Sequence, residues 1–220
     1  NGAAATFPDD GTTTEWTPTA PSKYLKVRTR TNHGDTGYGG RITVRFLQLK
    51  FAVGNFVATT SPPSPPSPPA SPLELTPPPM DWKWPAEHSV DCKDYHPRIG
   101  GGQEEVGGWG RGTDKLANAC DSSAAGYFHT YDYYGVNGDD YVDFIFTFDD
   151  DNTWCSGYRQ TGHSGWSVPT FTQDVEIYTG DANFGPWTKV ATDSHSTWHN
   201  GATPTTGPPP SGRPPHPAST

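Results

Sequence analysis

The run from residue 61 to residue 72 reads Ser-Pro-Pro-Ser-Pro-Pro-Ser-Pro-Pro-Ala-Ser-Pro, and it constrains the fold more than any other feature of the chain. Proline fixes φ and has no N–H, so this run, the Ser-Pro-Pro tract, is expected to adopt a polyproline II helix. Of the 24 prolines, 11 fall in residues 59–85 and 7 in residues 204–217. The chain therefore consists of foldable segments joined or followed by Pro-rich ones.

The overall charge excludes some partner classes. The 220 residues carry 15 Lys and Arg against 24 Asp and Glu, a formal charge of −9, and the basic residues form no cluster. This balance argues against nucleic acid or an anionic membrane as a partner. No run approaches the roughly 18 apolar residues of a membrane-spanning helix, so we expect no membrane insertion. Because Met80 is the only methionine and the chain starts at Asn1, we expect a processed chain or a fragment.

The periodicity outside the Pro-rich runs is that of β-strands. Residues 141–148 alternate apolar and polar positions, which predicts a half-buried strand, and 24–30 and 41–51 do the same on either side of a turn-rich connection, which predicts a hairpin. Further strands are expected at 172–179 and 187–192. The predicted inner-face residues of the hairpin are Leu25, Val27, Ile42, Val44 and Phe46.

These patterns divide the chain into five parts. They are a flexible N-terminal segment (1–11), β segment A (12–58), a Pro-rich spacer (59–82), β segment B (83–203) and a Pro-rich tail (204–220). A lone hairpin is marginal in water, so segment A must bury its inner face against segment B. That segment B belongs either to the same chain or to a neighbouring copy.

Several stretches of both segments share the pattern of one known family. In segment B these are Lys-Leu-Ala-Asn at 115–118, Asp-Tyr-Val-Asp-Phe-Ile-Phe-Thr-Phe at 140–148, Phe-Thr-Gln-Asp-Val-Glu-Ile-Tyr-Thr at 171–179 and Gly-Pro-Trp-Thr-Lys-Val-Ala at 185–191. Segment B thereby resembles the first two thirds of a discoidin domain, the coagulation-factor type C family. Segment A, in 23–34 and 40–46, resembles its closing strands. The resemblance implies an all-β fold, a jelly-roll β-sandwich of the galactose-binding-like type, here with polyproline II linkers.

The order of the two segments is reversed relative to that family, in which B precedes A. One explanation is circular permutation within a single chain, since the termini of domains often lie close together. The other is that segment A of one copy completes segment B of the next and builds a head-to-tail filament. The second is favoured, because a stiff spacer is poorly suited to joining two adjacent ends, although a bend at residues 73–75 would permit the first.

The Ser-Pro-Pro repeats are similar to the hydroxyproline-rich glycoproteins of green-algal and plant matrices and cell-surface appendages. This resemblance implies hydroxylated prolines that carry O-linked glycans and an extracellular location; the alternative is an unmodified spacer. The candidate glycan sites are Pro62, Pro63, Pro65, Pro66, Pro68, Pro69, Pro72, Pro77, Pro78, Pro79, Pro208, Pro209 and Pro210.

The sequence offers no catalytic motif and only a weak metal site. His195 and His199 lack the glutamate and the helical context of a zinc protease, so both are expected in surface loops. Asp149 and Asp151 could contribute oxygens to calcium, but the alternative is a solvated turn. The discoidin-like calcium loop is also altered, with Ala117-Asn118 after Leu116 and Thr43 on the matching final strand. We expect no enzyme activity and no cofactor, with structural calcium as the weaker alternative.

Aromatic residues in predicted loops could hold a sugar ring, whereas the competing interpretation is core packing. The candidates are His33, Tyr38, Trp154, Tyr158 and Trp166. The three cysteines allow one disulfide among Cys92, Cys120 and Cys155, in a pairing that the sequence leaves open.

Together these features predict an extracellular structural glycoprotein of a cell wall, matrix or cell-surface appendage. Its partners would be further copies of itself and its attached glycans. The hairpin's inner-face residues would form the self-assembly interface. The alternative is a monomeric, circularly permuted carbohydrate-binding module.

Overall fold

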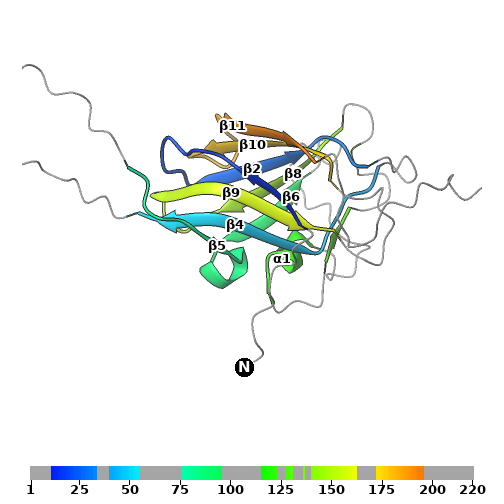
Figure 1. The fold of residues 1–220 in the computed structure, drawn as a ribbon, viewed down its shortest axis with the longest axis horizontal. Coiled ribbons are helices and arrows are strands. Elements are labelled where there is room, and N and C mark those ends of the chain that lie inside the picture. The colour runs from blue at the N-terminus through cyan, green and yellow to red at the C-terminus, as the bar shows by residue number, and fades with distance from the viewer. Residues whose placement is uncertain are drawn as a thin grey trace, which may run out of the picture.

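The computed structural model describes residues 11–33, 40–54, 76–95, 115–122, 127–130, 136, 140–162 and 172–195. In these ranges the chain is an all-β sandwich of antiparallel sheets, as the sequence predicts (Figure 1). The strands are β1 (Thr12–Glu15), β2 (Tyr24–Thr29), β3 (Thr43–Val44), β4 (Phe46–Val53), β5 (Asp81–Lys83), β6 (Asp91–Tyr95), β7 (Phe128–His129), β8 (Val142–Thr147), β9 (Thr153–Thr161), β10 (Asp174–Gly180) and β11 (Thr188–Ser194). A 3₁₀ helix, η2 (Pro85–His88), and one turn of α-helix, α1 (Leu116–Ala119), complete the described elements.

Two main sheets form the sandwich. One has the strand order β1-β9-β4-β5 and the other has the order β11-β10-β2-β8-β6, while β3 and β7 form a short separate pair. Segment A therefore contributes an inner strand to each main sheet, β4 to the first and β2 to the second. Segment B supplies most of the remaining strands.

The core lies between the two sheets. Phe144 and Phe146 on the inner face of β8 are fully buried, as the sequence predicts, but Asp143 and Ile145 on the other face are buried too, so the expected half-buried strand is wrong. The ring of Phe146 contacts that of Tyr158 on the opposite sheet, with centroids 6.4 Å apart. Phe51 and Phe148 make a second such contact at 5.4 Å. Both aromatic contacts bury apolar area between the layers, and the Phe51–Phe148 contact also joins segment A to segment B.

The predicted hairpin in segment A is wrong. β2 pairs with β8 and β10, whereas β4 pairs with β5 and β9, so the two strands belong to opposite sheets. The connection between them crosses from one layer to the other. Alternation within each strand is a local property, and it does not reveal which strand lies beside which.

The longest strand, β9, was not predicted from the sequence. Its residues Thr-Trp-Cys-Ser-Gly-Tyr-Arg-Gln-Thr do not alternate, because a register shift opposite Lys50 and Phe51 interrupts the pairing with β4. Gly157 lies directly beneath the ring of Trp82, and a Cβ atom there would come within 2.7 Å of it. The glycine is thus required by close packing rather than by a turn.

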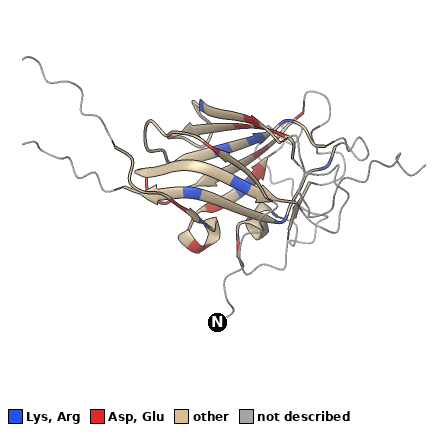
Figure 2. Ribbon diagram, in the orientation of Figure 1, with Lys and Arg blue, Asp and Glu red and all other residues tan. Residues whose placement is uncertain are grey.

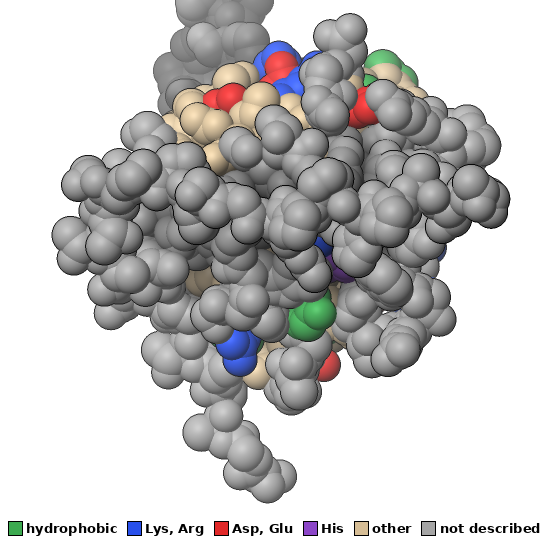
Figure 3. All heavy atoms as spheres, turned by 90° about the vertical axis from the view of Figure 1, so that its right-hand side faces the viewer, with side chains coloured by type: hydrophobic (Ala, Val, Ile, Leu, Met, Phe, Trp, Pro, Cys, Tyr) green, Lys and Arg blue, Asp and Glu red, His purple; other side chains and the backbone are tan. Residues whose placement is uncertain are grey.

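Charges of both signs are interspersed over the described strands (Figure 2). At the end of the molecule seen in Figure 3, acidic and basic side chains lie next to one another along the upper edge. In the described ranges, no helix has both the length and the apolar character that crossing a membrane requires.

Candidate functional site

The interface between segments A and B is the most extensive candidate site in the described structure. β2 lies between β10 and β8, with Val27 opposite both Ile177 and Phe144. β4 lies between β9 and β5, with Leu49 opposite both Tyr158 and Lys83. Segment A therefore completes the hydrogen-bond ladders of both main sheets, and its removal would open both of them.

Four of the five predicted assembly residues are buried in this interface. Leu25, Val27, Ile42 and Val44 have no exposed area. Phe46, by contrast, is only half-buried and packs edge-on against Trp84, with centroids 5.7 Å apart. The chain bends at Arg45, between β3 and β4, so the inner face continues through Leu47 rather than Phe46. The expected inner position of Phe46 is therefore wrong.

The outer face of β2 carries a second set of contacts between the segments. Nε and Nη2 of Arg28 donate to the two carboxylate oxygens of Asp143, both at 2.7 Å. The guanidinium carbon also lies 3.5 Å from the ring centroid of Tyr141. A bidentate pair of this kind fixes both the separation and the orientation of β2 and β8.

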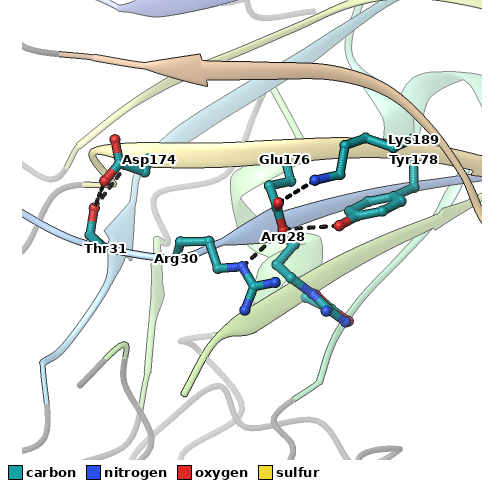
Figure 4. A network of polar contacts seen from close by, with 8 residues as sticks. Arg28, Arg30, Thr31, Asp174, Glu176, Tyr178 and Lys189 are labelled. Carbon is teal, nitrogen blue, oxygen red and sulfur yellow. Dashed lines mark hydrogen bonds and ion pairs between the residues drawn. The ribbon is translucent and has the colours of Figure 1, made fainter. Parts of the chain in front are cut away.

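Glu176 of β10 is the centre of a polar network on the same face (Figure 4). It accepts hydrogen bonds from Nε of Arg30 at 2.8 Å, from the hydroxyl of Tyr178 at 2.9 Å and from the ammonium group of Lys189. Burial opposes ionisation of Glu176, but these three donors outweigh it and lower its pKa from 4.5 to about 2. The carboxylate is thus held ionised between β2, β10 and β11.

Lys26 is held by aromatic rings beside that network. Its ammonium nitrogen lies 4.3 Å from the ring centroid of Tyr178 and 4.5 Å from that of Trp187, and the residue is 5% exposed. Burial lowers the pKa of Lys26, and the nearby charge of Asp143 partly opposes this. Both rings come from segment B, so this cation–π contact also joins the two segments.

Sequence analysis missed this outer-face network. A usable signal was present: Lys26, Arg28 and Arg30 alternate along one segment, while the acids Asp174 and Glu176 alternate along 172–179. Opposite charges on facing strands indicate cross-strand pairs. The signal could not be used without knowing that β2 and β10 are neighbours.

The described residues that precede the Ser-Pro-Pro tract lie beside those that follow it. Val53 at the end of β4 pairs with Thr153, and Gly54 follows. A Cβ atom on Gly54 would lie 3.1 Å from the ring of Trp154 and 3.5 Å from Pro78. The chain therefore leaves the sandwich at Gly54 and returns beside the same glycine at Pro78.

A surface pocket of about 390 Å³ lies between the β1–β2 connection and the β10–β11 turn. Trp16, Pro18 and Pro21 line one side, and Asp181, Pro186 and Thr188 belong to the other. No residue of this pocket was among the candidates from the sequence. Its walls come from two turns far apart in the chain, which explains the omission.

The predicted sugar-binding aromatics do not assemble into one site among the described residues. Trp154 and Tyr158 lie on β9 rather than in loops, and neither has exposed area, so their expected position is wrong. The hydroxyl of Tyr158 donates to Oε1 of Gln160 at 2.5 Å, which satisfies the polar end of the buried ring. Tyr38 and Trp166 lie outside the described residues.

His195 lies instead in a small polar cluster with Thr14 and Asp193. His195 is 9% exposed, so its expected surface position is wrong; His199 lies outside the described residues. The hydroxyl of Thr14 donates to Asp193 at 2.9 Å and lies 3.4 Å from Nε2 of His195. Burial lowers the pKa of His195, the charge of Asp193 opposes this, and nearby His33 lowers it further.

The candidate calcium ligands are exposed and lie in a turn. Asp151 pairs with Lys23 at 2.7 Å, and Asp150 accepts a hydrogen bond from the backbone of Asn152. In the described part of the chain no group of three or more potential ligands is close enough to hold a metal ion. These contacts fit the solvated-turn interpretation of the run.

The cysteine pairing that the sequence left open is settled. Cys92 and Cys120 form a disulfide, and Cys155 is a buried free thiol. Both bonded cysteines belong to segment B, so this disulfide does not link segment A to segment B. Of the candidate glycan sites, Pro77 and Pro78 are half-buried and Pro79 is exposed, while the others lie outside the described residues.

No protein-family model, curated protein or solved structure matches this chain.

Proposed function

We propose that this protein is a structural subunit of an extracellular glycoprotein fibre, in which segment A of one copy completes segment B of the next. The observation that carries the proposal is the position of β2 and β4, each an inner strand of a main sheet. Segment A is connected covalently to segment B only through the spacer, since the disulfide lies within B. It is therefore a unit that can be exchanged between copies.

Exchange would preserve every contact described between the segments. The Arg28–Asp143 pair, the Glu176 network and the apolar core form identically whether both partners belong to one chain or to two. The equilibrium between a closed single chain and an exchanged polymer then depends on the length and stiffness of the connection and on protein concentration. A head-to-tail exchange that does not close into a ring produces a fibre.

The stiffness of the Ser-Pro-Pro tract favours exchange. A straight polyproline II helix over residues 61–72 spans about 34 Å at about 3.1 Å per residue. To return to its starting point, the chain has the flanking steps from 54 to 61 and from 72 to 76, which reach about 37 Å when fully extended. Closure within one chain therefore requires extended flanks or a bent rod, whereas donation to a neighbour requires neither.

Two resemblances supply the biological setting of the proposal. The discoidin-like pattern, in reversed order, is what a segment-exchanged sandwich would show. The Ser-Pro-Pro repeats are similar to those of hydroxyproline-rich matrix glycoproteins, in which the prolines carry O-linked glycans. A hydrated glycan coat on the tract would keep assembled sandwiches apart and soluble, while main-chain pairing holds successive subunits together.

A monomeric, circularly permuted carbohydrate-binding module of a wall or matrix protein is the second candidate, and one observation favours its monomeric form. Phe51 in β4 pairs with Asp81 in β5, so the chain segments on either side of the Ser-Pro-Pro tract are neighbours in one sheet, and the expected end of the spacer at residue 82 is wrong because β5 already begins at Asp81. A single chain with a bent spacer would then close its own sandwich. This form would bind partners through its surface rather than polymerise.

Light scattering on the purified full chain tests the proposal. We expect masses of several copies that fall slowly on dilution, because exchanged sandwiches must open to separate. A variant in which a Gly/Ser sequence of equal length replaces residues 61–72 should shift to a single copy, since a flexible spacer closes easily. One copy at every concentration in both proteins would contradict the fibre and favour the monomeric module.

A further inference from the structure

The pocket beside the β10–β11 turn lies close to the start of the Ser-Pro-Pro tract. Val53 pairs with Thr153, and the backbone N–H of Ser22, a pocket residue, donates to the carbonyl of Thr153 at 2.9 Å. Neighbouring strands are about 4.8 Å apart, so Val53 is about 10 Å from the pocket wall. In Figure 1 the end of β4 and the β1–β2 connection lie at the same end of the sandwich.

The chemistry of the pocket suits an uncharged, ring-rich ligand. The indole of Trp16 and the rings of Pro18, Pro21 and Pro186 provide flat apolar walls. Asp181 is the single ionisable residue that lines it. Aromatic-lined grooves recognise polyproline II segments in peptide-binding domains, and Trp16 supplies an aromatic ring here. Hydroxyl groups such as that of Thr188 supply donors for the carbonyls of such a segment.

The sequence repeat of the tract has the same period as a polyproline II helix, so it presents its proline rings in regular rows. A polyproline II helix has three residues per turn, and the repeat is also three residues long. Over residues 61–69 the serines therefore follow one edge of the helix, and prolines follow the other two. The same pair of proline faces recurs about every 9 Å, so any of the repeats can enter the pocket. The tract carries no charge, in keeping with the lining.

We propose that this pocket binds one turn of the Ser-Pro-Pro tract of the same chain. From Gly54 to Ser61 the connection reaches at most about 24 Å, more than twice the distance from Val53 to the pocket wall. Binding fixes the direction in which the tract leaves the sandwich. A closed monomer and an exchanged polymer both have this pocket and this connection, so binding of the tract does not depend on the proposed fibre.

The probe is a synthetic, unmodified peptide of four Ser-Pro-Pro repeats. Its binding is measured by calorimetry and by tryptophan fluorescence. The receptor is the chain in which a Gly/Ser sequence replaces residues 61–72, so that the pocket is unoccupied. We expect saturable binding. The natural chain should bind the peptide at least about tenfold more weakly, because its tethered tract competes at an effective concentration in the millimolar range.

Two substitutions in the receptor test the assignment to this pocket. Trp16→Ala should weaken binding by about tenfold or more, since tryptophans commonly carry much of the energy of such contacts. Trp16 also packs against the core, so Thr188→Arg, at an exposed position on the rim, provides a second variant that blocks the pocket without opening the core. Trp82→Ala is the matched control: this tryptophan lies on β5, outside the pocket, and its loss should leave the affinity unchanged.

Several results would overturn the proposal. These are absence of peptide binding, equal affinities of the natural chain and the receptor, or undiminished binding in Thr188→Arg. Binding of free arabinose or galactose without binding of the peptide would assign the pocket to sugars instead. If deletion of residues 204–220 from the natural chain raises its affinity for the peptide, the Pro-rich tail is the occupant; no change is expected.

Discussion

Phe51 and Asp81 lie directly opposite each other in the antiparallel pair of β4 and β5, although the whole Ser-Pro-Pro tract separates them in the sequence. The tract is therefore inserted between two neighbouring strands of one sheet. Either it leaves and re-enters the same sandwich, or β4 and β5 of one sandwich come from two copies. The remaining contacts between segments A and B are identical in both cases.

The Glu176 network should contribute measurably to stability. Glu176 is mostly buried, and replacing it by Gln removes the negative charge that Arg30 and the exposed Lys189 share, so we expect a loss of about 1–3 kcal/mol in the free energy of unfolding. Urea denaturation monitored by tryptophan fluorescence gives this value. The matched control is Glu15→Gln, which removes an exposed pair with Lys50 and should change stability by less than about 0.5 kcal/mol.

The same network should respond to acid. The pKa of Glu176 in the folded chain is about 2, below its ordinary 4.5, so its contribution is complete above about pH 4.5 and is lost as the pH falls towards 2. Glu176→Gln should therefore reduce the difference in the free energy of unfolding between neutral and acidic pH. An unchanged difference would show that the ionised carboxylate does not stabilise the fold.

Mild acid should act through His195. Its pKa in the folded chain lies below 6.5, because the ring is buried. As the pH falls below about 6.5, the unfolded chain binds a proton that the folded chain does not, and the folded state loses stability. The urea midpoint should thus be lower at about pH 5.5 than at about pH 7.5. His195→Gln should reduce this difference; an equal difference in both proteins would exclude His195 as its cause.

The three cysteines should behave differently. The Cys92–Cys120 bond closes a loop with a sequence separation of 28, for which chain entropy predicts about 3–4 kcal/mol of stabilisation. The double variant with alanine at both positions should lose about this amount, measured by urea denaturation. Burial raises the pKa of Cys155 to about 12, so its thiol should react with iodoacetamide only after unfolding. Rapid alkylation of the native chain would contradict its buried position.

The sequence was informative about the position of β8 and about its inner face. Val142, Phe144 and Phe146 alternate with more polar positions, and β8 lies where this pattern predicts it. β9 escaped prediction because its register shift breaks the alternation and because Trp154 is covered by Gly54 on the outer side of the sheet. Burial of Trp154 on that side depends on a segment distant in the sequence, so local periodicity does not predict it.

The candidate site was predictable in part for the same reason. The burial of Leu25 and Val27 follows from alternation within β2. The partners of Arg28 and Arg30, by contrast, depend on strand order, and the pocket near Trp16 depends on two turns meeting in space. The Ser-Pro-Pro tract indicated an unusual connection, but only the pairing of Phe51 with Asp81 shows that it joins adjacent strands.

Cross-linking of paired cysteines tests the central claim, exchange of segment A between copies, most directly. Tyr24 and Thr147 are opposite each other on β2 and β8, so cysteines at both positions lie close enough for a short bismaleimide. The control pair, Thr179 and Thr188, joins β10 and β11 within segment B. The natural thiols do not interfere, because two are bonded and Cys155 is buried.

Denaturing gels then distinguish the two architectures. The proposed exchange predicts a ladder of covalent multimers for the Tyr24→Cys, Thr147→Cys protein and single chains for the Thr179→Cys, Thr188→Cys control. Single cross-linked chains from both proteins, at concentrations where the native material is assembled, would contradict exchange and show that each chain closes its own sandwich.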